Sequence, residues 1–271
     1  GVGVVLAVLW TKGKKPWISS AVMSLVPAGL VVSSIGIPLG ATRLYLDGIQ
    51  VDQGFRTQFL SRMTENLGHA DMAYKDLPTF YPMGWFWLGG RTANVLGMEG
   101  WEVYQPFAIA TLAAAAAMLT PVWRRLTGSL PTALAIATVT TAVVLTEVPE
   151  EPYAAVVAMF VPAAAVLSYR AVNGSWASTI ALAVYLGISA SFYTLFTAIA
   201  ALTMVVLAVI HTFTKHSVKP LVHLLVTGLG SLAIAAISWG PYVWRVLTGD
   251  EQLESTANHF LPIEGTYFPL P

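Results

Sequence analysis

The stretch PFAIATLAAAAAMLTPVW, residues 106–123, contains no charged side chain and is followed at once by Arg124 and Arg125. A helix that crosses a lipid bilayer needs roughly 20 consecutive, mostly apolar residues. Basic residues at the end of such a run mark the point where the chain leaves the hydrocarbon. The stretch therefore predicts a membrane-spanning helix with an arginine pair at one surface.

Similar apolar runs fill much of the remaining chain. Hydrophobic residues make up 56% of the sequence and charged residues only 10%, whereas a soluble domain carries about 25% charged residues. We therefore predict an all-α polytopic protein embedded in a lipid bilayer. Between 176 and 213 no clear break is visible, and Gly187 with the serines that follow is the best place for a turn. The further spans are expected at 1–10 (in part), 17–39, 131–147, 152–169, 176–190, 191–213 and 219–244.

The links between the spans alternate in charge. Basic residues fall in every second link if 176–213 crosses twice, and they favour the cytoplasmic side. The remaining links, about 40–105, 147–151 and 249–271, are then expected outside. Because the chain opens with half a span and ends in an extended proline-rich tail, we interpret residues 1–271 as one membrane-embedded domain from a longer protein. The basic links contain Lys12, Lys14, Lys15, Arg124, Arg125, Arg170, Lys215 and Lys219.

Charge and composition exclude several classes of function. The formal net charge is zero, which gives no indication of a nucleic-acid partner. The sequence has no cysteine, so thiolate catalysis, disulfides and cysteine metal sites are excluded. The spans contain almost no ionisable residues, whereas ion carriers place such residues at mid-membrane. The chemistry is therefore expected in the long outer loop, about 40–105.

One part of that loop has a helical pattern. In VDQGFRTQFLSRMTEN, residues 51–66, the apolar side chains recur at helical spacing, and Arg56 lies off that stripe. Asp52 is expected at the helix N-cap, with Arg56 one turn further on and able to form a surface ion pair with it. Asp47 adds a second carboxylate just upstream. A capped amphipathic helix with no further role stays open as the simpler interpretation.

A second short helix is expected further along the loop. After Pro78 and Pro82, a segment that begins near Trp85 is stopped by Gly97. It is too short to span a bilayer and is typical of an interfacial or re-entrant helix. Together the two helices would make a floor, lined by acids and bases, against the outer surface of the membrane.

Such a floor suits the transfer of a sugar from a lipid phosphate. The leaving phosphate needs a cation rather than a proton donor. The incoming sugar hydroxyl needs one carboxylate as general base. A divalent cation is possible at Asp47, Asp52, His69 and Asp71, but their spacing is no recognised ligand motif, so no metal ligand is assigned.

Three segments carry a family resemblance. They are VDQGFRTQFLSRMTEN (51–66), DLPTFYPMGWFWLGGR (76–91) and NHFLPIEGTYFPLP (258–271). An aspartate in the first outer loop, followed by a short amphipathic helix, resembles the GT-C class of glycosyltransferases that use polyprenyl-phosphate sugars. More closely, the three segments resemble the galactan 5-O-arabinofuranosyltransferases of mycobacterial and related cell envelopes.

The resemblance implies an arabinofuranosyltransferase of the plasma membrane with its active site on the extracytoplasmic face. It implies decaprenyl-phosphoryl-arabinose as donor and, as acceptor, the galactan of the cell-wall arabinogalactan. The general base maps to Asp52, with Asp47 as the alternative, and Gln53 and Arg56 follow that base. Charge and position alone, and not the resemblance, add Lys75 and Arg91 as candidates for contact with the donor phosphate, and Tyr81 and His259 are further candidates for substrate binding.

Other functions stay open at this point. The donor could carry another sugar on a polyprenyl phosphate. A transporter of lipid-linked sugars is a rival from another class, although it should carry polar groups through its spans. A non-catalytic scaffold would use Asp52 only as a helix cap.

Overall fold

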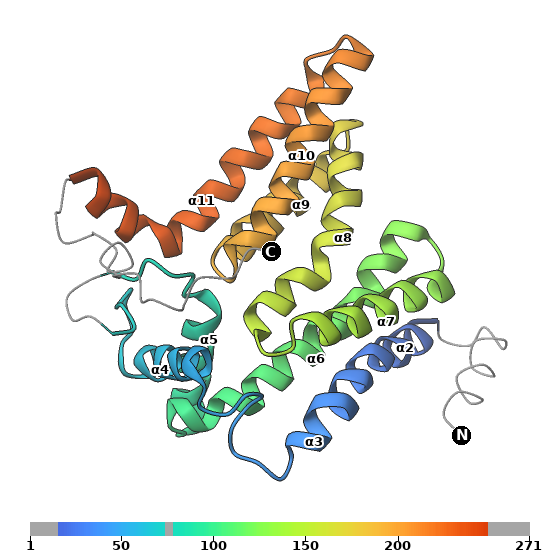
Figure 1. Ribbon diagram of the computed structural model, residues 1–271. Coiled ribbons are helices and arrows are strands. Elements are labelled where there is room, and N and C mark those ends of the chain that lie inside the picture. Colours follow the sequence, from blue (N-terminus) through green and yellow to red (C-terminus); the bar gives the residue numbers. More distant parts are fainter. Residues whose placement is uncertain (1–15, 74–77, 249–271) are drawn as a thin grey trace, which may run out of the picture.

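The computed structural model describes residues 16–73 and 78–248, and every regular element within these ranges is a helix (Figure 1). The expected segments at 1–10 and 249–271 and the candidates Lys75 and His259 lie outside the described residues. The elements are α2 (Pro16–Val31), the π-helical turn η1 (Val32–Gly36), α3 (Ile37–Leu39), α4 (Val51–Glu65), α5 (Gly84–Leu96), α6 (Gly100–Thr127), α7 (Leu130–Glu147), α8 (Pro152–Val172), α9 (Trp176–Ala190), α10 (Thr194–Lys215) and α11 (Lys219–Thr248).

Six of the described helical segments are long and apolar enough to cross a membrane. This confirms an all-α, multi-pass membrane protein. With 15 residues, α9 is apolar but shorter than the other spans. The six segments are Ala21–Leu39, Gly100–Thr127, Leu130–Glu147, Pro152–Val172, Thr194–Lys215 and Lys219–Thr248.

Helix α6 begins inside the expected outer loop, about 40–105. Helix α6 begins at Gly100, and Pro106 lies inside it. Glu99 and Glu102 form a capping box, in which the side chain of each residue accepts a hydrogen bond from the backbone N–H of the other. Because this satisfies free N–H groups of the first turn, the helix begins well before the proline. The connection between α5 and α6 therefore ends at residue 99.

The region 176–213 contains two helices, as predicted. The turn lies at 191–193, within the segment after Gly187, while Gly187 itself is inside α9. A Cβ at Gly187 would lie 2.6 Å from the Cβ of Ile234 and 2.9 Å from the carbonyl oxygen of Ser231. Gly187 is thus needed for the close approach of α9 and α11 and not for the turn.

Alternating helix directions collect the links at two ends. At the basic end, Arg170 donates to the carbonyl of Leu126 and Lys215 donates to Asn173, so the α6–α7, α8–α9 and α10–α11 links are neighbours. The opposite end, called the acidic end here, is formed by residues 40–50 together with the links 148–151 and 191–193.

Helices α4 and α5 lie together at the acidic end and pack against α6 (Figure 1). Glycines bring the backbones into contact: a Cβ at Gly90 would lie 2.5 Å from the carbonyl carbon of Met63, and one at Gly100 would lie 2.4 Å from the Cα of Ser61. Phe59 and Met63 of α4 are fully buried in this contact. The predicted short helix after Pro82 is thereby confirmed as α5, and Gly97, with φ of 65°, ends it.

A proline connects α11 to the long loop. Pro241 has no N–H group, so the carbonyl of Ile237, four residues earlier, lacks its usual partner within the helix. Nε2 of His69 lies 2.6 Å from that carbonyl oxygen. The loop thereby satisfies a backbone group that the proline leaves free, and α11 is tied to the acidic end.

Candidate active site

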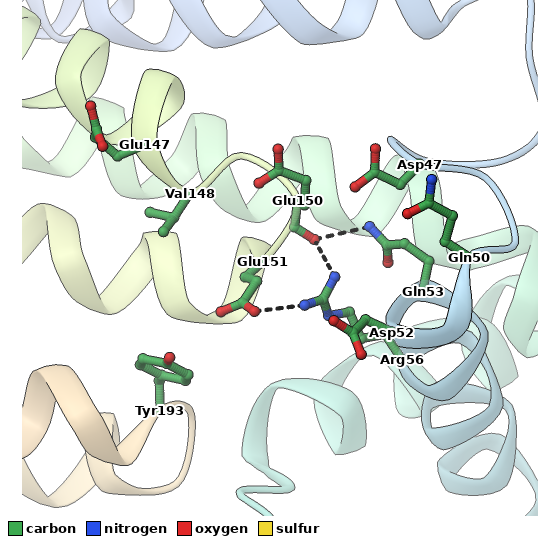
Figure 2. A pocket seen from close by; sticks show the side chains of 10 residues that line it. All are labelled: Asp47, Gln50, Asp52, Gln53, Arg56, Glu147, Val148, Glu150, Glu151 and Tyr193. Atoms are coloured by element: carbon green, nitrogen blue, oxygen red, sulfur yellow. Dashed lines mark hydrogen bonds and ion pairs between the residues drawn. The ribbon is translucent and has the colours of Figure 1, made fainter. Parts of the chain in front are cut away.

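A pocket of about 730 Å³ opens at the acidic end (Figure 2). It is built from three parts of the chain that are far apart in sequence: the start of α4 with the turn before it, the α7–α8 link, and the α9–α10 turn. Among the described residues, its walls contain five carboxylates and one guanidinium. The lining residues are Asp47, Gln50, Asp52, Gln53, Arg56, Glu147, Val148, Glu150, Glu151 and Tyr193.

Hydrogen bonds hold the α7–α8 link against the start of α4. The hydroxyl of Tyr45 donates to the carbonyl of Pro149 at 2.8 Å. Nε2 of Gln53 donates to the carbonyl of Glu150 at 3.0 Å, and the Tyr104 hydroxyl donates to Oε1 of the same amide at 3.3 Å. Gln53 is 2% exposed, so both ends of its amide serve to fix the pocket wall. Its predicted role in binding substrate stays a prediction.

Arg56 uses all three guanidinium nitrogens on this same wall, and Figure 2 shows its contacts with Glu150 and Glu151. One terminal nitrogen donates to Oε1 of Glu151 at 2.6 Å, and the other lies 3.4 Å from the carbonyl oxygen of Glu150. Nε donates to the hydroxyl of Tyr153 at 3.3 Å. The expected surface ion pair with Asp52 is wrong, because Arg56 is only 6% exposed and pairs across the pocket with Glu151. A helical pattern along α4 could not reveal a partner in the distant α7–α8 link.

Burial and neighbouring groups shift the pKa values of Arg56 and Tyr45 beside the pocket. Burial acts to lower the pKa of Arg56, but the neighbouring Tyr153 and Glu151 outweigh it and the pKa lies above its usual value. Burial raises the pKa of Tyr45, and the negative charge of Glu150 adds to this. Arg56 therefore stays charged and Tyr45 stays a donor across the neutral range.

Asp52 and Asp47 both face the pocket from exposed positions. The expected N-cap role of Asp52 is wrong: Gln50 occupies the N-cap, and Asp52 is the second residue of α4. In the first turn its carboxylate is still stabilised by the helix dipole. Asp47 has φ of 64°, a left-handed conformation that aspartate tolerates better than most residues.

Of the other sequence candidates, Tyr81 and Arg91 belong to the described residues, and neither lines the pocket. The Tyr81 hydroxyl is 2.9 Å from that of Tyr153, so Tyr81 supports the residue that holds Arg56. Burial raises the pKa of Tyr81, which keeps this hydroxyl protonated. Arg91 donates to the carbonyls of Met63, Thr64 and Asn66 at the C-terminal end of α4. These carbonyls have no partner within the helix, so Arg91 acts as a cap there and not as a visible part of the pocket.

Comparison with known proteins assigns the chain to a family. Residues 1–271 match the family model described as "Arabinofuranosyltransferase N terminal". The chain belongs to this family. It is 56% identical over 248 residues to a galactan 5-O-arabinofuranosyltransferase of Corynebacterium glutamicum, covering 91% of this chain and 38% of that protein.

Mycobacterial relatives with the same name are more distant. The chain is 36% identical over 269 residues to the protein of Mycolicibacterium smegmatis, covering 97% of this chain and 43% of that protein. It is 36% identical over 273 residues to that of Mycobacterium tuberculosis, covering 97% and 42%. The chain thus spans about two fifths of the length of the curated relatives it matches. The resemblance found in the sequence is confirmed at the level of the family.

The four residues considered for a cation do not come together in this member of the family. Asp47 and Asp52 line the acidic pocket, whereas His69 lines a separate, mostly apolar pocket and contacts Ile237. Asp71 is fully buried, and its Oδ1 accepts from the backbone N–H of Ala73. Within residues 16–73 and 78–248 no group of three or more histidine and acidic side chains is placed to hold a metal ion.

The structure adds pocket residues that sequence reasoning missed. Glu147, Glu150 and Glu151 all come from EVPEEP, residues 147–152, and Tyr193 comes from the α9–α10 turn. A signal was present, because the alternation of basic links already placed this acidic link on the same side as Asp52. The sequence could not show that the link reaches the start of α4.

Chemically, the arrangement combines proton acceptors with one fixed cation. Exposed carboxylates at 47 and 52 can accept a proton from a hydroxyl group. Arg56, buried and charged, can hold one anionic group through charge-assisted hydrogen bonds. Both are requirements of sugar transfer from a lipid phosphate.

Proposed function

We propose that this chain forms the membrane-embedded catalytic part of an arabinofuranosyltransferase that transfers arabinofuranose from decaprenyl-phosphoryl-arabinose to the galactan of cell-wall arabinogalactan. The named relatives support the sugar and the acceptor. One observation on the chain itself carries the proposal: two exposed aspartates share a pocket with a buried arginine at one end of an apolar helix bundle.

The reaction follows from these groups. The carboxylate of Asp52 accepts the proton of the acceptor hydroxyl as that oxygen attacks the anomeric carbon of arabinose. The bond between this carbon and the phosphate oxygen breaks, and the prenyl phosphate leaves with the bonding electron pair. Arg56 stabilises the charge that develops on the departing oxygen. A leaving phosphate needs no proton, so a second acid, as in glycosidases, is not required.

We further propose that the acidic end faces the outside of the plasma membrane. Five cationic residues gather at or beside the basic end, namely Arg124, Arg125, Arg170, Lys215 and Lys219. Such residues favour the cytoplasmic side. Five carboxylates of the described chain line the pocket at the other end, which favours an enzyme working at a surface over a transporter with polar groups along its spans.

The experiment compares Asp52→Asn and Asp47→Asn in the intact protein. Asparagine keeps the size of the side chain and tolerates the left-handed backbone at position 47, but it cannot act as the base. Loss of a general base costs about 10²–10⁴-fold in rate. We expect this loss for Asp52→Asn, measured as transfer from decaprenyl-phosphoryl-arabinose to a synthetic galactan oligosaccharide.

Glu65→Gln is the matched control, since Glu65 lies at the far end of α4, paired with Arg62. It should transfer arabinose like the wild type. Loss of activity only in Asp47→Asn would assign the base to Asp47. Full activity in both aspartate variants would remove the pocket from the reaction and refute the proposal.

A further inference from the structure

Arg56 is the only cationic side chain among the described residues that line the acidic pocket, and its charge is already paired. An incoming lipid phosphate needs a cation. Four other carboxylates share the pocket lining and repel an anion, so Arg56 is the one described lining residue whose charge attracts it. Either the donor binds elsewhere or it takes the place of the present partner.

The two members of the ion pair differ in their freedom to move. The side chain of Arg56 is 7% exposed, and the hydroxyl of Tyr153, itself bonded to Tyr81, accepts from its Nε. The side chain of Glu151 is 28% exposed. No side-chain hydrogen bond links Glu151 to the first turn of α8, where it is the N-cap residue. Arg56 is therefore the fixed member, and Glu151 is the one that can rotate out of the contact.

We propose that the carboxylate of Glu151 occupies the phosphate subsite of the empty enzyme, and that the phosphodiester of the donor displaces it from Arg56. This rests on the proposed function and identifies the phosphate site within it. A phosphodiester carries one negative charge, as a carboxylate does. The exchange thus leaves the charge facing Arg56 unchanged, because a phosphate oxygen takes the place of Oε1 of Glu151 on the terminal guanidinium nitrogen.

The remaining acidic wall gives the subsite a preference. Asp47, Asp52, Glu147 and Glu150 stay in the pocket lining after the exchange. Each additional negative charge on a ligand is repelled by them, while Arg56 can neutralise only one. The site therefore selects a lipid with one phosphodiester charge over a diphosphate-linked lipid.

The test measures binding of farnesyl methyl phosphate, a singly charged phosphodiester without a sugar, to the intact protein in detergent. In Glu151→Gln the competing charge is gone, while the amide oxygen can still accept from Arg56 and preserve the wall. We expect about three- to tenfold tighter binding than in the wild type, because a competing charge-assisted hydrogen bond has been weakened. Arg56→Gln should bind about tenfold more weakly or worse.

Glu147→Gln is the matched control, because it removes the same charge from the same pocket without touching Arg56. We expect a change of less than about twofold there, since exposed charges are screened by salt. Equally tighter binding in Glu147→Gln and Glu151→Gln would show that the affinity depends only on the total negative charge of the pocket, and would overturn the proposed phosphate subsite. Weaker binding in Glu151→Gln would show that Glu151 positions Arg56 for the ligand, and this result would also overturn the proposed phosphate subsite.

A second probe tests the preference for a single charge. Farnesyl diphosphate should bind the wild type more weakly than the methyl phosphodiester, and tighter binding of the diphosphate would contradict the role of the acidic wall. Because neither probe carries arabinose, binding as predicted without any arabinose transfer would leave the phosphate subsite standing and refute only the proposed function.

Discussion

Replacing Gly90 by alanine should force α4 and α5 apart. The new Cβ would lie 2.5 Å from the carbonyl carbon of Met63, 2.6 Å from its oxygen and 2.7 Å from the nitrogen of Thr64, where ordinary contact begins at 3.4 Å. All three atoms belong to the backbone, so no side chain can turn away. The helices must separate by about 1 Å, and overpacking of this kind costs about 1–3 kcal/mol.

Part of this cost is offset, because alanine favours the helix over glycine by about 0.5–1 kcal/mol. The net loss in the free energy of unfolding should be about 1–2 kcal/mol. The bonds from Arg91 to the end of α4 should lengthen with the shift. Reversible unfolding of the purified protein in mixed micelles of mild detergent and dodecyl sulfate measures the loss.

Gly54→Ala is the control on the same pair of helices. It lies within α4, and its nearest neighbour would be the carbonyl oxygen of Ile49 at 3.9 Å. Without a clash, only the gain in helix preference remains, and we expect this variant to be more stable by about 0.5–1 kcal/mol. Should Gly90→Ala prove as stable as Gly54→Ala, the close backbone contact between α4 and α5 would be refuted.

Three other variants test the pocket and its orientation. Arg56→Lys keeps the charge but offers one nitrogen where three are used, so we expect loss of arabinose transfer and about 1–3 kcal/mol of stability; transfer at the wild-type rate would show that the fork geometry is not needed. Because the chain has no cysteine, Ile49→Cys at the acidic end should react with an impermeant maleimide on whole cells and Lys219→Cys at the basic end should not. Labelling of Lys219→Cys from outside would reverse the proposed orientation.

Much of the bundle could be predicted from apolar runs, since span length follows from membrane thickness. The boundaries were harder, because local chemistry decides them. Pro106 looked like a helix start, yet the capping box at Glu99 and Glu102 extends α6 past it. Gly187 looked like a turn, yet it serves the contact between α9 and α11. A single residue type signals several uses, and only its neighbours in space distinguish them.

The candidate site, like the fold, could be predicted from the sequence only in part. Asp47, Asp52, Gln53 and Arg56 were named from the sequence and do line one pocket. Arg91, chosen for its charge, caps a helix instead. The partner of Arg56 could not be predicted, because helical spacing reports only neighbours on the same helix, and Glu151 belongs to another segment.

The ion pair between Arg56 and Glu151 joins positions 95 residues apart. A ribosome adds about 5–20 residues per second, so about 5–20 s pass between the synthesis of these two side chains. During that interval the residues of α4 have been synthesised, while the acceptors at Glu150, Glu151 and Tyr153 have not. The wall of the pocket is completed only when the α7–α8 hairpin has entered the membrane, and Tyr193 follows later still. The two aspartates are synthesised early, but the pocket that encloses them is completed late in the biogenesis of the chain.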